Sequence, residues 1–460
     1  MRKFLPVVFL TSIIFSLSVL SFAMADEAAG QPATAPAVQS TQPAVPVAVQ
    51  TPPASKVDSG DTAWMLISTA LVMFMTPGLA FFYGGMVRRK NVLGTVMHSF
   101  IILCIVSITW VLWGYTLAFG PDHGGIIGGL DFFGLKGVGQ TPSPYAPTIP
   151  AILYMMYQGM FAAITPALIT GAFAERIKFS AVVIFTVLWA TFVYSPVAHW
   201  VWGGGWIAKK GALDFAGGTV VHINSAVAAL AAALLIGRRK GYMKEEMPPH
   251  NLPLTILGAA ILWFGWFGFN AGSALTAGGL ASVAFVTTNT ATAAAALSWS
   301  LAEYIYRKKP TALGAASGAV AGLVAITPAA GFVSPMASII IGAIAGIVCY
   351  VAVNLKPLFG YDDALDVVGV HGVGGFWGAM ATGLFAWTAI NSGGANGLFH
   401  GNPAQVKVQF IASISTIIYS FVVSLILFKL VDWTIGLRVK QDDEEIGLDL
   451  SQHGERGYHF

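Results

Sequence analysis

The chain has 460 residues, of which 56% are hydrophobic and only 10% are charged. Soluble globular proteins carry about 25% charged residues, so this composition indicates an integral membrane protein. The formal net charge of +3 is too small to indicate a nucleic-acid partner. Both cysteines lie in apolar runs, which argues against a disulfide framework and against a thiolate metal site.

The N-terminal 25 residues have the pattern of a secretory signal peptide. Arg2 and Lys3 precede an apolar run over residues 4–22, and Ala-Met-Ala at 23–25 provides a cleavage site. An uncleaved membrane anchor is the alternative for this segment. Residues 26–61 are rich in Pro, Ala, Gln and Ser, which predicts a disordered extracytoplasmic leader.

Apolar segments of about 18 to 27 residues recur from residue 62 onward, and each is long enough to cross a hydrocarbon core of about 30 Å. We therefore predict an all-α membrane protein with eleven transmembrane helices within 62–434, followed by a cytoplasmic regulatory tail at 435–460. The predicted spans are 62–86, 94–119, 151–174, 180–198, 218–237, 253–272, 280–304, 311–332, 336–355, 366–390 and 408–434.

The basic residues give an independent test of this topology. With the N-terminus outside, the predicted inner loops hold thirteen Lys and Arg residues and the predicted outer loops hold four. This asymmetry follows the positive-inside rule, and it places the C-terminus in the cytoplasm. The four outer residues are Lys136, Lys209, Lys210 and Lys407.

Glycines at four-residue steps predict close contacts between helices. One series contains Gly314, Gly318 and Gly322, and another contains Gly342 and Gly346. Small residues on one helix face let backbones approach closely in lipid. We interpret these glycines as packing residues.

Three weak sequence matches relate each span to the span five positions later. Because five is odd, the two halves are predicted to be inverted in the membrane, as in many transport proteins whose pathway runs between the halves. The matches are ITPA at 164–167 and 326–329, FYGG at 82–85 with FNAG at 269–272, and the pairs Asp214–His222 and Asp363–His371, each separated by eight residues.

His222 and His371 lie at corresponding positions of the two halves. Ionisable groups within spans usually face a cavity or another polar group, because facing lipid is costly. The pair is therefore predicted to meet at a central site, where it lines a pore or binds a metal or haem. Structural histidines bonded to backbone carbonyls are the alternative.

Asp214 enters its span from the outer side. A carboxylate there can accept N–H groups at a helix N-terminus, or it can attract a cation to the outer mouth. Both interpretations stay open. Asp363 and Asp366 precede their span from the inner side and favour the capping interpretation.

Aromatic and hydroxyl side chains near the outer ends of spans form a candidate cation site. Tyr157 and Phe161 share a helix face, as do Phe269 and Ser273, and Trp202 lies in a glycine-rich outer loop. Aromatic faces attract a small cation by about 0.5–2 kcal/mol each, and the serine oxygen can accept a hydrogen bond from it.

Several segments resemble the ammonium transporter (Amt) family, over residues 62 to about 455. The resemblance implies eleven spans in pseudo-twofold halves, a pore through each subunit, a homotrimer and a bacterial inner-membrane location, with no metal or other cofactor. The segments are MTPGLAFFYGGMVRRKNVL, GAFAERIKFSAV, HWVWGGGWIAKKGALDFAGGTVVHINSA, HNLPLTILGAAILWFGWFGFNAGS and DVVGVHGVGG.

The resemblance also implies roles for the candidate site residues. Tyr157 stands where some members have phenylalanine, which places a hydroxyl at the outer vestibule. The tail is close to the family pattern, with Gly457 where alanine is common, and it implies a signalling protein of the PII type as a partner. The matching positions are Phe161, Trp202 and Ser273 for the outer ammonium site, Phe161 and Phe269 for a stacked phenyl gate, His222 and His371 for the twin-histidine pair, and Asp214 for the essential aspartate.

The predicted function is ammonium transport. Ammonium binds at the aromatic vestibule and loses a proton, and neutral ammonia then passes the phenyl gate and the histidine pair. One alternative is a sensor that signals through the cytoplasmic tail, and another is a membrane haem protein with two histidine ligands. An enzyme is not indicated, because no nucleophile–base constellation or phosphate loop is present. Acceptance of methylammonium is left open.

Overall fold

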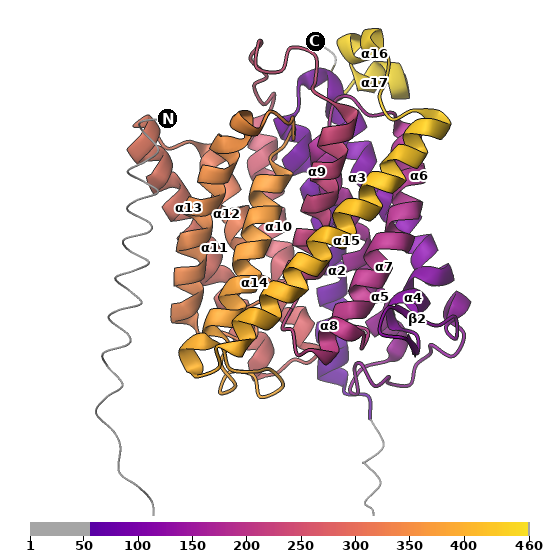
Figure 1. The fold of residues 1–460 in the computed structure, drawn as a ribbon, viewed down its shortest axis with the longest axis vertical. Helices are drawn as coiled ribbons and strands as arrows, with labels where there is room; N and C mark the ends of the chain where they lie inside the picture. Colours follow the sequence, from indigo (N-terminus) through magenta and orange to yellow (C-terminus); the bar gives the residue numbers. More distant parts are fainter. Residues whose placement is uncertain (1–55, 459–460) are drawn as a thin grey trace, which may run out of the picture. The chain divides into compact units, whose positions relative to one another are not determined.

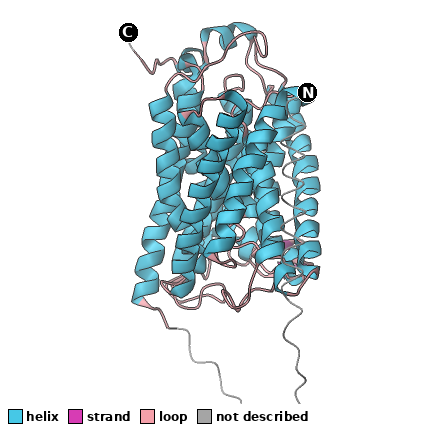
Figure 2. Ribbon diagram, turned by 90° about the vertical axis from the view of Figure 1, so that its left-hand side faces the viewer, coloured by secondary structure: helices cyan, strands magenta, loops and turns pink. Residues whose placement is uncertain are grey.

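The computed structural model describes residues 56–458, which form a bundle of α-helices (Figure 1). The helices lie side by side, and the loops gather at the two ends of the bundle (Figure 2). The predicted signal peptide and most of the predicted leader fall in residues 1–55, outside the described residues. Within the described residues, the first helix begins at Ser59, where the Asp58 side chain accepts the N–H of Asp61 and caps the helix.

Within residues 56–458, nine helices are long and apolar enough to cross a membrane. They coincide with nine of the predicted spans, so the multi-pass all-α class is confirmed. The nine are Ser59–Met86 (α2), Arg89–Phe119 with α3 (Val92–Thr109) and α4 (Tyr115–Phe119), Ala151–Phe173 (α5), Phe179–Lys209 with α6 (Phe179–Trp189), α7 (Ser195–Val201) and α8 (Trp206–Lys209), Gly218–Ile236 with η5 (Gly218–Ile223) and α9 (Asn224–Ile236), Leu252–Ala274 with α10 (Leu252–Asn270), Gly279–Arg307 (α11), Pro335–Phe359 (α13) and Ala404–Ile435 (α15).

The two other predicted spans form shorter helices. The first is α12 (Ala312–Ile326), and the second is the π-helical segment η7 (Val368–Gly372) continued by α14 (Val373–Phe385). Helix α12 ends before Pro328, which has no N–H for a further turn. The carbonyl of Pro328 instead accepts the N–H of Phe215 at 3.1 Å. The count of eleven spans therefore remains a prediction.

Related spans of the two halves pack directly against each other. Helix α2 contacts α10, and η5 contacts η7 and α14. A Cβ on Gly78 would lie 2.6 Å from Ile261 Cγ2, and a Cβ on Gly258 would collide with the backbone of Phe82. Only glycine allows this approach, so α2 and α10 are in close backbone contact.

The glycine steps are also contact faces, as predicted. A Cβ on Gly318 would lie 2.6 Å from Trp299 Cβ, and one on Gly322 would lie 2.7 Å from the carbonyl of Ala291, so α12 packs closely on α11. Gly342 and Gly346 of α13 face the backbone of α11 in the same way. Helix α11 therefore packs closely on both α12 and α13, which also contact each other.

Buried ion pairs join the loops at one end of the bundle. The Glu175 carboxylate lies 2.8 Å from Arg88 Nη2 and 3.2 Å from Arg239 Nη1, and Arg239 also pairs with Asp362 at 2.9 Å. Burial opposes ionisation of Glu175, but Arg239 and Arg88 hold its pKa below the usual value. The cluster thus fixes the predicted inner loops to one another.

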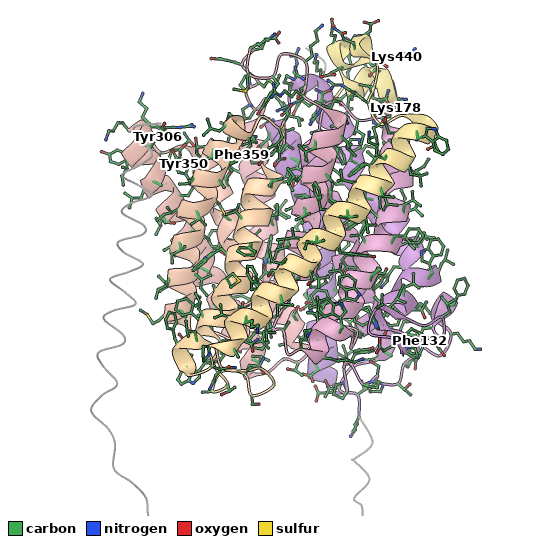
Figure 3. The ribbon with its side chains drawn as sticks, viewed as in Figure 1. Phe132, Lys178, Tyr306, Tyr350, Phe359 and Lys440 are labelled. Atoms are coloured by element: carbon green, nitrogen blue, oxygen red, sulfur yellow. The ribbon has the colours of Figure 1, made fainter. Side chains whose placement is uncertain are left out.

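The C-terminal tail lies at this same end. It contains α16 (Gln441–Ile446) and α17 (Leu448–His453), and Figure 3 shows Lys178 and Lys440 there while Phe132 lies at the opposite end. Glu444 pairs with Arg438 at 2.7 Å. Asp449 accepts the N–H of Gly94 at 2.8 Å, at the start of α3.

A short hairpin lies at the opposite end from the tail. Strand β1 (Asp122–His123) pairs antiparallel with β2 (Ile127–Gly128). Helix α15 runs obliquely across the bundle in Figure 1 and packs on α9 and α14. It thereby contacts both spans that carry the predicted pore histidines.

Candidate functional site: an aromatic vestibule and a histidine-lined pore

Five of the predicted site residues form a continuous column of rings. Trp202 and Phe161 meet edge to face with centroids 5.9 Å apart, and Phe161 and Phe269 are 4.2 Å apart. The column continues from Phe269 to His222 at 6.1 Å and from His222 to His371 at 5.3 Å. The rings of the predicted outer site, gate and histidine pair therefore form one unbroken series of contacts.

Trp202 is half-buried and follows the last residue of α7. Its indole N–H donates to the carbonyl of Asp214 at 2.9 Å. This bond fixes one edge of the ring, while the opposite side of the column is formed by Phe161 from α5. The outer end of the column thus brings the Trp202 indole and the buried Phe161 ring into contact.

Tyr157 differs from its predicted placement. Its ring contacts Phe161 at 5.0 Å, as expected for residues four apart on one helix. Its hydroxyl, however, is buried and lies 2.9 Å from the carbonyls of both Gly268 and Phe269 and 3.2 Å from Ser273 Oγ. The hydroxyl therefore secures the end of α10 and Ser273 and is not an open vestibule group.

Ser273 lies at the outer end of α10, in the segment that follows Asn270. Its hydroxyl donates to the carbonyl of Phe269 at 2.8 Å. Because its proton is used in this bond, the Ser273 oxygen has a lone pair left to accept a hydrogen bond from a cation. The side chain is partly exposed.

His222 and His371 come from the two related segments η5 and η7. Both segments are π-helical. Such turns are rare in proteins overall, but those that occur are often found at functional sites. Both side chains are buried, and their Nδ1 atoms are 3.2 Å apart. Two nitrogens at this distance share one proton, so one ring donates and the other accepts.

The histidines line a narrow and mostly apolar cavity. The space open to the centre of a water-sized molecule is about 10 Å³, which is roughly one such molecule. Within residues 56–458, no atom makes a hydrogen bond with His222 Nε2. The lining consists of Met75, Leu79, Phe82, Ile164, Leu168, Val221, His222, Leu262, Trp266, Phe269, Val320 and His371.

A second cavity continues from the first toward the end of the bundle that holds the tail. Phe82 and His371 line both cavities. The second cavity also reaches Tyr83, Met86 and Asp366. The second cavity therefore adjoins the first at His371, and its lining includes the carboxylate residue Asp366.

Asp214 serves as a multiple cap. Its two carboxylate oxygens accept the N–H groups of four successive residues, 217–220, at 2.7 to 3.2 Å. These donors are the N-cap residue Gly217 and the first three residues of η5, which carries His222. Burial raises the pKa of Asp214, and the four N–H donors oppose that shift.

Asp363 has the equivalent place before η7. Its Oδ2 accepts the N–H of Val368 at 2.7 Å. Burial raises its pKa to about 6. Asp366, predicted as a second cap, instead pairs with Lys356 at 2.5 Å and adopts a φ of 62°.

Three further residues of this region were not singled out in the sequence. Phe82 lines both cavities, and Trp266 stacks on His222 at 5.4 Å. Buried Gln409 of α15 bonds both the N–H and the carbonyl of Leu213, each at 2.7 Å, and so holds the chain beside Asp214. The sequence match between FYGG and FNAG aligns Phe82 with Phe269, so it could have identified Phe82 as a site residue.

Nothing in the described part of the chain gathers three or more His, Cys, Asp or Glu side chains in a way that could hold a metal ion. The two pore histidines also contact each other directly. Since their cavity has room for roughly one water-sized molecule, a haem does not fit between them.

Residues 63–458 match the family model described as Ammonium Transporter Family. The chain belongs to the ammonium transporter family. An ammonium transporter of Bacillus subtilis is 58% identical over 400 residues, which cover 87% of this chain and 98% of that protein. The crystal structure of Candida albicans Mep2 has 39% sequence identity and a TM-score of 0.81, and it covers 87% of this chain and 91% of that one.

A solved structure titled "Sensor Amt Protein" is also similar to this family member. It has 29% sequence identity and a TM-score of 0.80, over 86% of this chain and 98% of that one. Likeness on this scale establishes the membrane fold and the family. It leaves the roles of individual pore residues to be argued from their geometry.

Proposed function

We propose that this member of the family captures ammonium at the aromatic vestibule and conducts it inward as neutral ammonia, while the proton travels separately. The observation that carries this proposal is the pair of buried imidazoles, whose Nδ1 atoms are 3.2 Å apart in an apolar cavity directly beyond a phenyl pair. Protein-mediated ammonium uptake into vesicles, set against protein-free vesicles, is the first test.

The cavity favours a neutral molecule over an ion. Ten of its twelve lining residues are apolar or aromatic without ionisable groups, and the cavity is narrow. Burying an unpaired charge in such surroundings is costly, whereas ammonia avoids most of that cost. Ammonium can lose a proton and enter in this form, but potassium cannot, so the same cavity excludes potassium.

The vestibule supplies the opposite chemistry, because it attracts the cation before deprotonation. The Trp202 and Phe161 rings offer two faces to a cation, and Ser273 offers an oxygen acceptor. Asp214 contributes negative charge close to Trp202, whose indole bonds its carbonyl. Capture and conduction thus occupy separate parts of the column.

The histidine pair also supports the proposed route of the proton. The two rings share one proton between their Nδ1 atoms. In the ring whose Nδ1 donates, Nε2 is an acceptor, and in the other ring Nε2 is a donor. One ring can therefore accept a hydrogen bond from ammonia while the other donates one. These roles exchange when the accepting Nε2 takes up a proton, the shared proton passes to the other Nδ1, and the Nε2 of that second ring releases its own proton.

Trp202→Leu is expected to weaken capture of dilute ammonium. Loss of one cation–π contact of about 0.5–2 kcal/mol predicts a rise of about 2- to 30-fold in the half-saturation concentration, with a smaller change in maximal rate. Uptake measured over a range of ammonium concentrations checks this. An unchanged half-saturation concentration would remove the vestibule from the proposal.

The proposal extends to the setting of the protein. It places a homotrimer in the bacterial inner membrane, with a cleaved signal peptide, an external N-terminal leader and a cytoplasmic tail that binds a PII-type protein. The excess of basic residues in the loops at the tail end supports the orientation.

A sensory role in addition to transport is a second candidate. Likeness to the structure titled "Sensor Amt Protein" and the bonding of α17 to the start of α3 favour it. Vesicles containing protein truncated after residue 434 separate the two roles. Continued ammonium flux assigns transport to the membrane domain, whereas lost flux indicates that the tail acts on the pore.

A further inference from the structure

One carboxylate joins three elements at the outer end of the molecule. Asp122 of β1 accepts the N–H of Gly125 within its own hairpin through Oδ1, at 2.7 Å. The same Oδ1 lies 3.0 Å from His199 Nε2 of α7, and Oδ2 accepts from Lys209 Nζ of α8 at 2.5 Å. The hairpin is thereby fastened to the segments on both sides of the glycine-rich loop.

His199 is fully buried between two acceptors. Its Nδ1 is 2.9 Å from the carbonyl of Ala118, and its Nε2 faces Asp122. His199 and Lys209 hold the pKa of Asp122 below its usual range, so the carboxylate is ionised and can only accept. Through its two ring nitrogens, His199 therefore links the carbonyl of Ala118 to the carboxylate of Asp122.

Trp202 lies between the two fastened segments. The hairpin makes further bonds on either side of it, since Trp200 Nε1 donates to Ile126 O at 2.7 Å and Trp206 N donates to Gly125 O at 3.0 Å. Gly203 has no room for a side chain, because a Cβ would collide with the carbonyl of Ala118. The backbone that presents Trp202 is therefore set by the hairpin.

The position of this backbone determines how Trp202 meets the vestibule. The ring makes one side-chain hydrogen bond, to Asp214 O, and meets Phe161 edge to face at 88°. A shift of the loop would move the indole along the vestibule without altering the pore beyond it. Such a shift would change capture and leave conduction intact.

We propose that Asp122 is a positioning residue for substrate capture, which acts through His199 and Lys209 on the loop that presents Trp202. Asp122 does not line either cavity of the pore. The inference rests on the proposed function, because a capture defect requires that Trp202 binds ammonium.

Asp122→Asn is expected to raise the half-saturation concentration for ammonium about three- to tenfold, with the maximal rate changed by less than about twofold. The asparagine keeps the shape, but it cannot present two acceptor oxygens to His199 and Lys209 together. Asp122→Glu is expected to recover part of the affinity. Concentration-dependent uptake in vesicles is the measurement.

Asp131→Asn is the matched control. Asp131 is exposed in the same outer loop, and this change removes the same negative charge. If Asp122 acts by position, Asp131→Asn leaves the half-saturation concentration unchanged. An equal rise in both variants would show simple electrostatic attraction and would overturn the proposal.

The double variant Asp122→Asn with Trp202→Leu gives the decisive comparison. If Asp122 acts through Trp202, it adds little to the effect of Trp202→Leu alone, and fully additive effects contradict the proposal. A null result for Asp122→Asn while Trp202→Leu is impaired refutes this inference alone. A null result for Trp202→Leu refutes the vestibule itself.

A second variant keeps the test valid if Asp122→Asn does not accumulate in membranes. The Lys209 side chain is 60% exposed, so Lys209→Gln is expected to fold normally. It should raise the half-saturation concentration by about twofold, the effect of one exposed ion pair. No rise in this variant would then overturn the proposal.

Discussion

Replacing both pore histidines, His222→Ala with His371→Ala, is expected to slow ammonium transport by roughly 10²-fold, the rate contribution usual for positioned proton-transfer groups, and so to lower the ammonium-to-potassium selectivity. The change removes the shared proton between the Nδ1 atoms and enlarges a cavity that holds about one water-sized molecule. Water and hydrated ions then have space to enter. Ammonium-evoked and potassium-evoked fluxes in vesicles measure the ratio.

The single variants sharpen this prediction. Because the two rings share one proton, each single alanine variant is expected to show most of the effect of the double variant. His400→Ala, at an exposed position of the outer loop, serves as the control and should behave as the parent protein. Unchanged transport together with unchanged selectivity in the double variant would leave the histidine pair without a role.

Asp214→Asn is expected to lower the stability of the protein and to abolish most transport. At least two of the four N–H groups that Asp214 accepts would face the amide NH₂ of asparagine. Each buried N–H left without an acceptor costs about 1–3 kcal/mol, so a loss of about 2–6 kcal/mol follows. The affected groups begin η5, and His222 would lose its fixed position.

Asp363→Asn is the internal control for that prediction, since Asp363 holds the equivalent place before η7. Its carboxylate accepts from the N–H groups of Val368 and Val367, half the number at Asp214, so a smaller loss of stability is expected. Thermal unfolding of the purified proteins and ammonium uptake provide the two measurements. Equal losses in both variants would show that the number of N–H bonds does not determine the effect.

Much of the fold followed from the sequence, because hydropathy and segment length specify which residues enter the membrane. Helix α12 was predicted to be longer, since its apolar run continues to residue 332 while Pro328 ends the hydrogen-bonding pattern. The π-helical form of η5 and η7 had no signal in hydropathy.

The site was predictable to the extent that its residues stood out chemically. Histidines in apolar spans, and a tryptophan among glycines, are conspicuous in a sequence. Phe82 and Trp266 are not, because aromatic residues are common throughout such spans. Gln409 acts only on backbone atoms 196 residues away, and no local pattern reports a contact of that kind.

The hydroxyl of Tyr157 shows a different limit. Helical spacing correctly placed its ring beside Phe161. Where its oxygen lies depends on the carbonyls at the end of α10, which belong to another span. Contacts between spans decide whether a polar atom faces the pore or the protein.

The most direct measurement of the central claim compares potassium and ammonium in vesicles that contain the purified protein, under equal gradients of the two ions. If nitrogen crosses the pore as neutral ammonia, ammonium gives protein-dependent uptake and potassium gives none above protein-free vesicles. A potassium flux comparable to the ammonium flux would show that an intact cation passes the histidine pair, and it would contradict the account.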